Sequence, residues 1–402
     1  MSIYFILALY CSLSNTQKSK KCYNSNMQSW IKNILIAVMF IIFSVGGYLL
    51  YPKLNKNVII PQREDAETAL NSENSPEETK TNAVEPTALT PKKEDNIPPP
   101  EPPLPVGTDR FTISLTNTNE EIASNLLKAE FIANKESFIT ILNKEKVAIT
   151  PGAYKLSKVM TPSQINKVLH NKPYMKWVVI KPGLRKEEIA TILSGTLGWT
   201  SKQKNNWIKV DTNTSPEYTE GVYYPDTYLI PVDEEPSLVA KRLISKFNEN
   251  FSTYLPQFTA KNIKWARALT LASIVQREAS GTSDMPLVAG ILWNRLNQNM
   301  ALSVDATLQY IRGDIGKGWW APITVADKQT DSPFNTYKYK GLPPHPISNP
   351  GISAIEAVLN PKVTDCLYYL HDKNRVTHCA KTYEEHQQNI ETYLIGDNTI
   401  PS

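Results

Sequence analysis

One long stretch of the chain carries no charged residue, and it limits the architectures open to the rest. Residues 34–50 read ILIAVMFIIFSVGGYLL, with Lys32 before them and Lys53 after them. A run of this length is at the short end of what crosses the hydrocarbon core of a bilayer. The sequence therefore predicts a transmembrane helix over residues 34–51. A buried core helix fits poorly beside the Pro-rich tail that follows.

The N-terminal segment, residues 1–33, is expected on the cytoplasmic side. Lysines and arginines near the span slightly favour its N-terminal side, which sets this orientation. Residues 1–13, MSIYFILALYCSL, form a shorter apolar run without the basic start and small-residue exit of a cleaved signal. Met27 is an alternative start, so the run is left out of the fold prediction.

The next segment, residues 52–107, changes in composition from Gln62 to Val106, where it is rich in Glu, Pro, Thr, Asn and Lys and ends in PPPEPPLPV. This stretch has almost no aromatic or branched side chain to bury, and such a segment cannot offset the entropy cost of ordering itself. We expect a disordered tether, stiffest at its Pro-rich end, that holds the rest of the chain away from the bilayer.

The remainder predicts an α+β fold in two parts. Residues 108–175 combine an alternating strand, RFTISL, with helix-periodic segments and a helix opened by Thr161 and Pro162, which suit a cap and a first turn. A strand, KWVVIKPG, and a helix, RKEEIATILSGTLG, come next. Residues 176–397 are therefore expected to form a second, larger α+β domain.

Several function classes find no support in the sequence. The net charge of +4 is small for 402 residues, and no block of basic residues interleaves with aromatics, so nucleic acid is not an expected partner. No Gly-rich phosphate loop and no GxSxG motif is present. The five histidines do not match a metal-binding spacing: His378 and His386 lie on either side of an expected strand-to-helix junction. We expect no metal site.

The segment LASIVQREAS, residues 271–280, ends a helical pattern with a carboxylate. At roughly 100° per residue, Glu278 falls inside the apolar stripe of this helix. The polar arc is expected to contain Thr270, Ser273 and Arg277.

A carboxylate in that position has two chemical outcomes. Burying the ionised form costs several kcal/mol, so Glu278 either meets a cation or takes up a proton with a raised pKa. A Glu kept protonated near neutral pH can act as a general acid. The alternatives are an exposed residue in the last turn or a structural ion pair, because perturbed carboxylates are also common in structural networks.

The motifs around and after this helix are specific. In order come ASIVQRE, DMPLVAGILWNRL, SVDATLQYI, DSPFNTYKYKGLPPHPISNPG, and finally CLYYL and HCAKTYEEH. Residues 177–394 thereby resemble the YceG-like family of endolytic murein transglycosylases, with weaker similarity back to about residue 110. The resemblance implies that Glu278 is the single catalytic acid and base. Family members often have a second Glu where this chain has Gln276, so its absence here supports Glu278.

The resemblance also implies a glycan-binding cleft. The positions that match its motifs are Asn294, Asp305, Thr307, Ser332, Asn335, Thr336 and Tyr337. Each has a structural alternative: Asp305 can cap a helix, Asn335 can form a turn, and Tyr337 can be a core aromatic. Residues 108–175 resemble the LysM-like subdomain of the family, which would bind or orient peptidoglycan.

The chain departs from the family pattern at three places. Ala306 replaces a usual Pro, His345 replaces a usual Gly, and Cys379 and Ala380 stand where an aromatic normally follows the His. His345 could narrow the cleft or add a donor to it, so the departures bear on substrate preference. Glu220 and Asp226, in EGVYYPDTYLI, are candidates for a second carboxylate, although a carboxylate beside Gly or Pro is more often a turn former.

The implied reaction is cleavage of the bond between N-acetylmuramic acid and N-acetylglucosamine inside nascent peptidoglycan strands, giving 1,6-anhydro ends, without a metal or organic cofactor. It would limit strand length from a single-pass anchor in the plasma (inner) membrane, with the catalytic domain on the periplasmic side and peptidoglycan synthases as partners. The alternatives are an inactive peptidoglycan-binding scaffold and a hydrolytic muramidase that pairs Glu278 with Glu220 or Asp305.

Cys366 and Cys379 are expected on two strands joined by the short connection HDKNR. Antiparallel pairing would place them opposite each other or nearly so, and an oxidising compartment permits a disulfide. The sequence supports this disulfide as a hypothesis.

Overall fold

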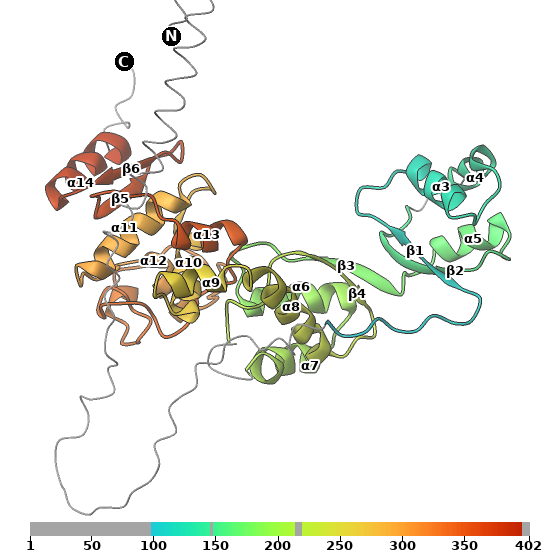
Figure 1. Cartoon of the computed structure of the whole chain (residues 1–402), viewed down its shortest axis with the longest axis horizontal. Coiled ribbons are helices and arrows are strands. Elements are labelled where there is room, and N and C mark those ends of the chain that lie inside the picture. Colours follow the sequence, from blue (N-terminus) through green and yellow to red (C-terminus); the bar gives the residue numbers. More distant parts are fainter. Residues whose placement is uncertain (1–97, 145–147, 214–218, 396–402) are drawn as a thin grey trace, which may run out of the picture. The chain divides into compact units, whose positions relative to one another are not determined.

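The computed structural model describes residues 98–144, 148–213 and 219–395, all within the unit Ile60–Ser402. The predicted N-terminal segment, the transmembrane helix over 34–51 and most of the tether over 52–107 lie outside these residues. Among the residues that are described, no helix combines the length and the apolar character needed to cross a membrane. The described part has a mixed α+β fold, as predicted (Figure 1).

A four-stranded sheet runs through the first half of the described chain. Its strands are β1 (Asp109–Ile113), β2 (Gly152–Leu156), β3 (Met175–Val179) and β4 (Thr227–Pro231), and every neighbouring pair is antiparallel (Figure 1). The sheet crosses the predicted border between residues 175 and 176, because β3 pairs with β2 on one side and with β4 on the other. Neither edge of β3 is left open, and hydrogen bonds therefore join the two predicted domains.

Three helices pack beside β1 and β2: α3 (Asn119–Lys128), α4 (Lys135–Leu142) and α5 (Pro162–Leu169). Their buried residues form a small hydrophobic cluster with those of the two strands. Helix α5 begins as the sequence predicts, since the Thr161 side chain accepts the Gln164 backbone N–H and Pro162 occupies the first turn. The Trp177 indole donates to the Ile113 carbonyl at 2.9 Å and ties β3 to β1.

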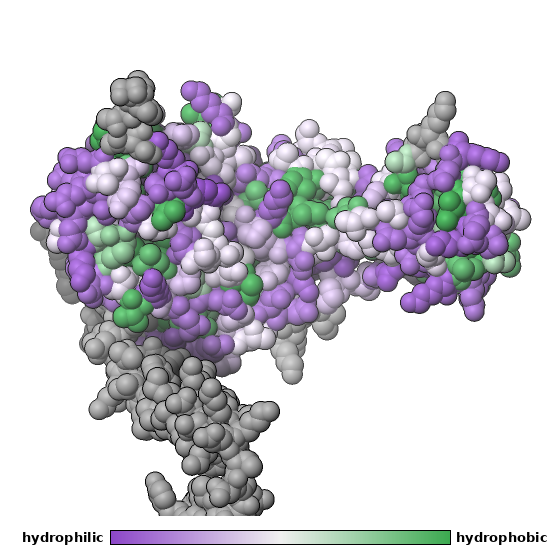
Figure 2. Space-filling view, turned by 90° about the horizontal axis from the view of Figure 1, so that it is seen from above, coloured by the Kyte–Doolittle hydropathy of each residue, from purple (hydrophilic) through white to green (hydrophobic). Residues whose placement is uncertain are grey.

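The rest of the chain is largely helical and surrounds a larger hydrophobic cluster. Its elements are α6 (Lys186–Leu197), α7 (Ser201–Asn206), the π-helix η3 (Trp207–Asp211), α8 (Pro236–Phe251), α9 (Leu255–Ala260), α10 (Trp265–Glu278), α11 (Met285–Asn297), α12 (Asp305–Arg312), the 3-10 helix η5 (Asp327–Gln329), α13 (Ile352–Leu359), β5 (Tyr368–His371), β6 (Thr377–Ala380), α14 (Tyr383–Ile390) and the π-helix η6 (Glu391–Ile395). On the face seen in Figure 2, hydrophobic residues lie in small groups among hydrophilic ones.

Helix α10 lies at the centre of this helical part, in contact with α9, α11, α12 and α13. The predicted polar arc is wrong for two of its three residues, because Thr270 and Ser273 are buried. Their hydroxyls are satisfied locally: Thr270 donates to the Ala266 carbonyl, and Ser273 Oγ accepts the Ile347 N–H at 3.0 Å. Neighbouring helices cover α10 on more than one side, so a helical pattern that assumes one buried face underestimates its burial.

Candidate active site

The Glu278 carboxyl is the last side chain of α10 and is half-buried. The Tyr369 hydroxyl on β5 donates to Glu278 Oε2 at 2.7 Å. The backbone N–H of Ala306, in the first turn of α12, also donates to this carboxyl. The catalytic candidate therefore lies where the end of one helix, the start of another and a β-hairpin meet.

Opposing effects act on the proton affinity of this group. Burial raises the pKa of Glu278, and the nearby Asp305 carboxylate raises it further. The hydrogen bonds from Tyr369 and Ala306 lower the pKa of Glu278, yet the net direction is upward. Of the two outcomes that the helical pattern left open, the structure favours the raised pKa, because the direct partners of the carboxyl are a hydroxyl and an amide.

Asp305 does not cap α12, contrary to the structural alternative considered for it. Val304 occupies the cap position and Asp305 is the first helical residue, without a side-chain cap bond. The Tyr337 hydroxyl instead donates to Asp305 Oδ1. Burial and the Asp305 charge raise the pKa of Tyr337, which therefore remains a donor. Asp305 and Tyr337 form a polar pair close enough to act on Glu278.

Asn294 lies on α11 and its amide holds the segment that leads into the hairpin. Nδ2 donates to the Thr364 carbonyl at 2.7 Å and to the Cys366 carbonyl at 3.1 Å. Both amide hydrogens of Asn294 are donated to backbone carbonyls, so Asn294 positions the segment that precedes β5. Its contact with a glycan stays a prediction.

Arg295, the next residue of α11, connects two elements that carry partners of Glu278. Its Nε donates to the Leu367 carbonyl just before β5, and its Nη1 donates to the Leu302 carbonyl before α12 at 2.7 Å. Tyr369 and Ala306 follow these two anchors along the chain. One guanidinium thus braces both donors that reach the candidate acid.

A disulfide joins Cys366 and Cys379, with an S–S distance of 2.07 Å and a Cα–Cα distance of 5.8 Å. The expected placement is wrong in one respect: Cys379 lies on β6, but Cys366 precedes β5, and the residue opposite Cys379 is Tyr369. The cross-link therefore runs from the entry of the hairpin to its second strand. It restrains the hairpin that carries Tyr369.

The loop that contains SPFNTY is organised by a buried amide. Asn335 Nδ2 donates to the Lys328 and Thr330 carbonyls, and Oδ1 accepts the Tyr337 backbone N–H at 3.0 Å. Asn335 has no exposed surface. Asn335 therefore forms a turn, as the structural alternative for it predicted. This turn places Tyr337 beside Asp305. Direct binding of glycan by Asn335 stays a prediction.

Thr307 and Thr336 are both buried and form one hydrogen-bonded unit. Their hydroxyl oxygens are 3.0 Å apart, and Thr336 Oγ1 also accepts the Val304 N–H at 3.0 Å. They join the start of α12 to the SPFNTY loop. The geometry assigns them to holding these elements, and the predicted glycan contact remains untested.

Ser332 is half-buried, unlike the fully buried Asn335 and Thr336 of the same loop. Together with Asp331, Pro333, Tyr339, Lys340, Leu342 and Pro344 it lines a cavity of about 520 Å³. The cavity offers hydroxyl, carboxylate and ammonium groups beside apolar rings, a combination suited to a polar ligand such as a sugar. Of the predicted glycan-binding residues, only Ser332 lines this cavity.

The comparisons with known proteins point in one direction. The model of the YceG-like family matches residues 111–392. The chain belongs to the YceG-like family. The endolytic murein transglycosylase of Bacillus subtilis is 29% identical over 300 residues, which cover 69% of this chain and 82% of that protein.

Two further relatives of this YceG-like chain extend the comparison. The endolytic murein transglycosylase of Streptococcus pneumoniae is 32% identical over 177 residues, or 44% of this chain and 32% of that protein, so the match spans about a third of its length. The crystal structure of a YceG-like protein from Listeria monocytogenes superposes with a TM-score of 0.52 at 27% identity, covering 70% of this chain and 98% of that one.

His345, a departure from the YceG-like pattern, packs in an aromatic cluster. Its ring centroid is 4.7 Å from that of Phe334 and 5.9 Å from that of Tyr310. Nδ1 lies 2.7 Å from the Pro346 carbonyl oxygen, and burial lowers the pKa of His345. The His345 ring thus packs against Phe334 of the SPFNTY loop. An effect of His345 on substrate preference stays a prediction.

Ala306 is a departure with a chemical consequence. The Pro usual at this position has no N–H, so a chain with Pro there lacks the amide donor that Ala306 provides to Glu278. The variant Ala306→Pro should raise the pKa of Glu278 and move the alkaline limb of the kcat/KM profile to higher pH. Pro suits the first turn of a helix, so the fold should survive. An unchanged limb in the pH–rate profile would contradict this.

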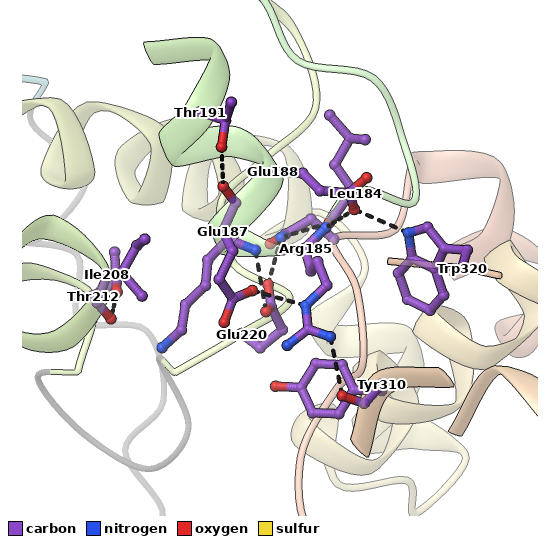
Figure 3. A network of polar contacts seen from close by, with 12 residues as sticks. Leu184, Arg185, Glu187, Glu188, Thr191, Ile208, Thr212, Glu220, Tyr310 and Trp320 are labelled. Carbon is purple, nitrogen blue, oxygen red and sulfur yellow. Dashed lines mark hydrogen bonds and ion pairs between the residues drawn. The ribbon is translucent and has the colours of Figure 1, made fainter. Parts of the chain in front are cut away.

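Glu220 is buried and holds the start of α6, so it is not a turn former. Oε2 accepts the Lys186 backbone N–H at 3.2 Å, and Oε1 accepts Asn349 Nδ2 at 2.6 Å. Figure 3 shows it beside the Arg185 and Glu187 side chains. Burial, reinforced by the Glu187 charge, raises the pKa of Glu220 to about 8. Its environment is structural, and Asp305 is the carboxylate that acts on Glu278.

Sequence reasoning missed Tyr369, Arg295 and the role of Gln276. Gln276 Oε1 accepts the Gly351 N–H at 3.0 Å and anchors the NPG segment to α10. Arg295 and Tyr369 stand inside the motifs NRL and CLYYL, which provided the only available signal. Spacing could not reveal that Tyr369 contacts a residue 91 positions away.

Proposed function

We infer that this chain is an endolytic murein transglycosylase, a lyase that cleaves inside peptidoglycan strands. Its membership of the YceG-like family and the names of its relatives support this function. One structural observation carries the mechanism: Glu278 is a half-buried carboxyl with a raised pKa and two hydrogen-bond donors. Such a group can be protonated before the reaction and stabilised as a carboxylate during it.

The reaction needs a proton at its first step. The Glu278 O–H would give its proton to the oxygen between N-acetylmuramic acid and N-acetylglucosamine, and the bond from C1 to this oxygen breaks. The leaving sugar keeps the oxygen and the proton. The raised pKa of Glu278 supports this role because it increases the protonated fraction of the carboxyl at a given pH.

The second step returns the proton. The Glu278 carboxylate would remove the proton of the muramic C6 hydroxyl while O6 bonds to C1, which yields the 1,6-anhydro end and regenerates the acid. Water is not consumed. Positive charge that develops on the sugar ring would be stabilised by negative groups nearby, for which Asp305 beside Tyr337 is the best-placed candidate.

A hydrolytic muramidase is the second candidate, because the Asp305 carboxylate lies close enough to raise the pKa of Glu278. Hydrolysis and transglycosylation differ in the fate of water. We would digest purified glycan strands with the full chain in heavy-oxygen water and identify the new ends by mass spectrometry. Anhydro ends without heavy oxygen are expected.

The other outcomes of this digestion are equally informative. Reducing ends that carry heavy oxygen would establish the muramidase and overturn the transglycosylase. Strands that stay intact while the protein sediments with them would establish the binding scaffold. Ends that appear within strands, rather than only at their termini, are expected for an endolytic enzyme.

The cellular setting is part of the proposal. The apolar run over residues 34–51 and the tether over 52–107 support a single-pass anchor in the plasma (inner) membrane with the catalytic domain outside the cytoplasm. Such an enzyme would shorten nascent strands beside peptidoglycan synthases. Residues 108–175, as a LysM-like subdomain, would bind or orient the strand.

A further inference from the structure

The Glu278 carboxyl must perform two opposite tasks in the proposed reaction, and its two oxygens are not equivalent in the structure. Oε2 accepts the Tyr369 hydroxyl at 2.7 Å. Tyr369 is itself held firmly, since its strand is restrained by the Cys366–Cys379 disulfide and its register places it opposite Cys379. A donor fixed in this way restricts the rotation of the carboxyl that it binds.

We propose that Tyr369 is a positioning residue for the catalytic carboxyl: its hydroxyl holds Oε2, so that Oε1 exchanges the proton with the glycan in both steps. The proposal rests on the transglycosylase function. The Tyr369 O–H donates throughout and never leaves its oxygen, because burial and the Glu278 charge raise the pKa of Tyr369 well above its usual range. Only Glu278 gains or loses a proton, and the cycle has no net proton change.

Charged and titratable groups face Glu278 from every element that meets at the site. Asp305 on α12 raises the pKa of Glu278, and His371 on β5 lowers it. Arg295 on α11 and Arg277 on α10 also interact with it, as does the Tyr337 hydroxyl. Tyr369 differs from these charged groups because its hydroxyl hydrogen-bonds to the carboxyl. Removing its hydroxyl therefore alters the carboxyl directly and leaves the surrounding charges in place.

The test is Tyr369→Phe in the full chain, with Tyr368→Phe as the matched control. Consecutive strand residues face opposite sides. The Tyr368 ring packs on Tyr383 and His386 and lies under the Arg295 guanidinium, and phenylalanine keeps these ring contacts. Loss of the Tyr369 hydroxyl removes a bond that stabilises the carboxylate, so the pKa of Glu278 should rise. The alkaline limb of kcat/KM should move up by about one pH unit, and kcat should fall roughly 10- to 100-fold.

A merely structural tyrosine would behave differently. It would lower the melting temperature or the amplitude of the profile and leave the alkaline limb where it is, and that result would overturn the proposal. Tyr368→Phe should leave the limb and kcat unchanged. Wild-type protein that forms no anhydro ends would refute the proposed function itself, which keeps the two failures distinct.

A second variant guards against loss of folding in Tyr369→Phe. A ring-fluorinated tyrosine at position 369 keeps the shape of the side chain and makes its hydroxyl a stronger donor. The alkaline limb should then move to lower pH, opposite to the shift in Tyr369→Phe. A limb that does not move with the fluorinated residue would also reject the role of Tyr369.

Discussion

Glu278→Gln is expected to abolish the formation of anhydro ends, with a loss of about 10⁴-fold in kcat, while the protein stays folded. General acid or base catalysis contributes typically about 10²- to 10⁴-fold, and in the proposed mechanism one group serves both steps. Glutamine keeps an oxygen that can accept the Tyr369 hydroxyl, so the site should keep its shape. Product ends are measured by mass spectrometry and stability by the melting temperature.

Glu356→Gln is a matched control for this variant. Glu356 on α13 also accepts a tyrosine hydroxyl, that of Tyr254, at 2.7 Å, but it is exposed and is not among the groups that act on Glu278. Its replacement should leave the rate unchanged. Activity within about tenfold of wild type in Glu278→Gln would refute the assignment of the catalytic acid.

Glu220 should make the folded protein less stable as the pH rises. The pKa of Glu220 is about 8 in the folded state, above the ordinary value of 4.5 that an unfolded chain would show. Between these values the folded state binds the extra proton, so the contribution to stability is complete below pH 4.5 and disappears as the pH passes through 8. The slope is at most about 1.4 kcal/mol per pH unit.

Glu220→Gln removes this titration and should flatten the pH dependence of unfolding across the same window. The glutamine amide cannot accept from both Lys186 and Asn349, so the variant should lose about 1–3 kcal/mol at low pH. Chemical denaturation at several pH values measures both effects. An unchanged slope in Glu220→Gln, with Glu356→Gln as the surface control, would show that Glu220 does not carry the linkage.

Local features of the fold could be predicted from the sequence. The opening of α5, with its cap at Thr161 and Pro162 in the first turn, agrees with the pattern. These features depend on a few neighbouring residues, since a cap is satisfied within one turn. The sheet that joins the two predicted domains could not be foreseen, because strand pairing depends on contacts far apart in sequence.

The residues predicted to form the site fall into two groups in the structure. Asp305 and Tyr337 meet beside Glu278, whereas Thr307 on α12 and Asn335 in the SPFNTY loop are buried. The motifs contain residues of both kinds. The sequence alone therefore does not distinguish a side chain that faces the site from one that supports its neighbours. Only burial and hydrogen bonds make that distinction.

The sequence by itself determined that Glu278 ends an apolar helix, because helical periodicity is a local property of adjacent turns. It left open whether the carboxyl meets a cation or takes up a proton with a raised pKa. The tertiary structure alone decided which groups surround the carboxyl. Tyr369 is 91 residues away along the chain, and Asn294 and Arg295 anchor to α11 the segment that leads into its hairpin. Hydrogen bonds between residues so far apart in the sequence depend on how the elements pack, and the spacing of residues along the chain does not predict that packing.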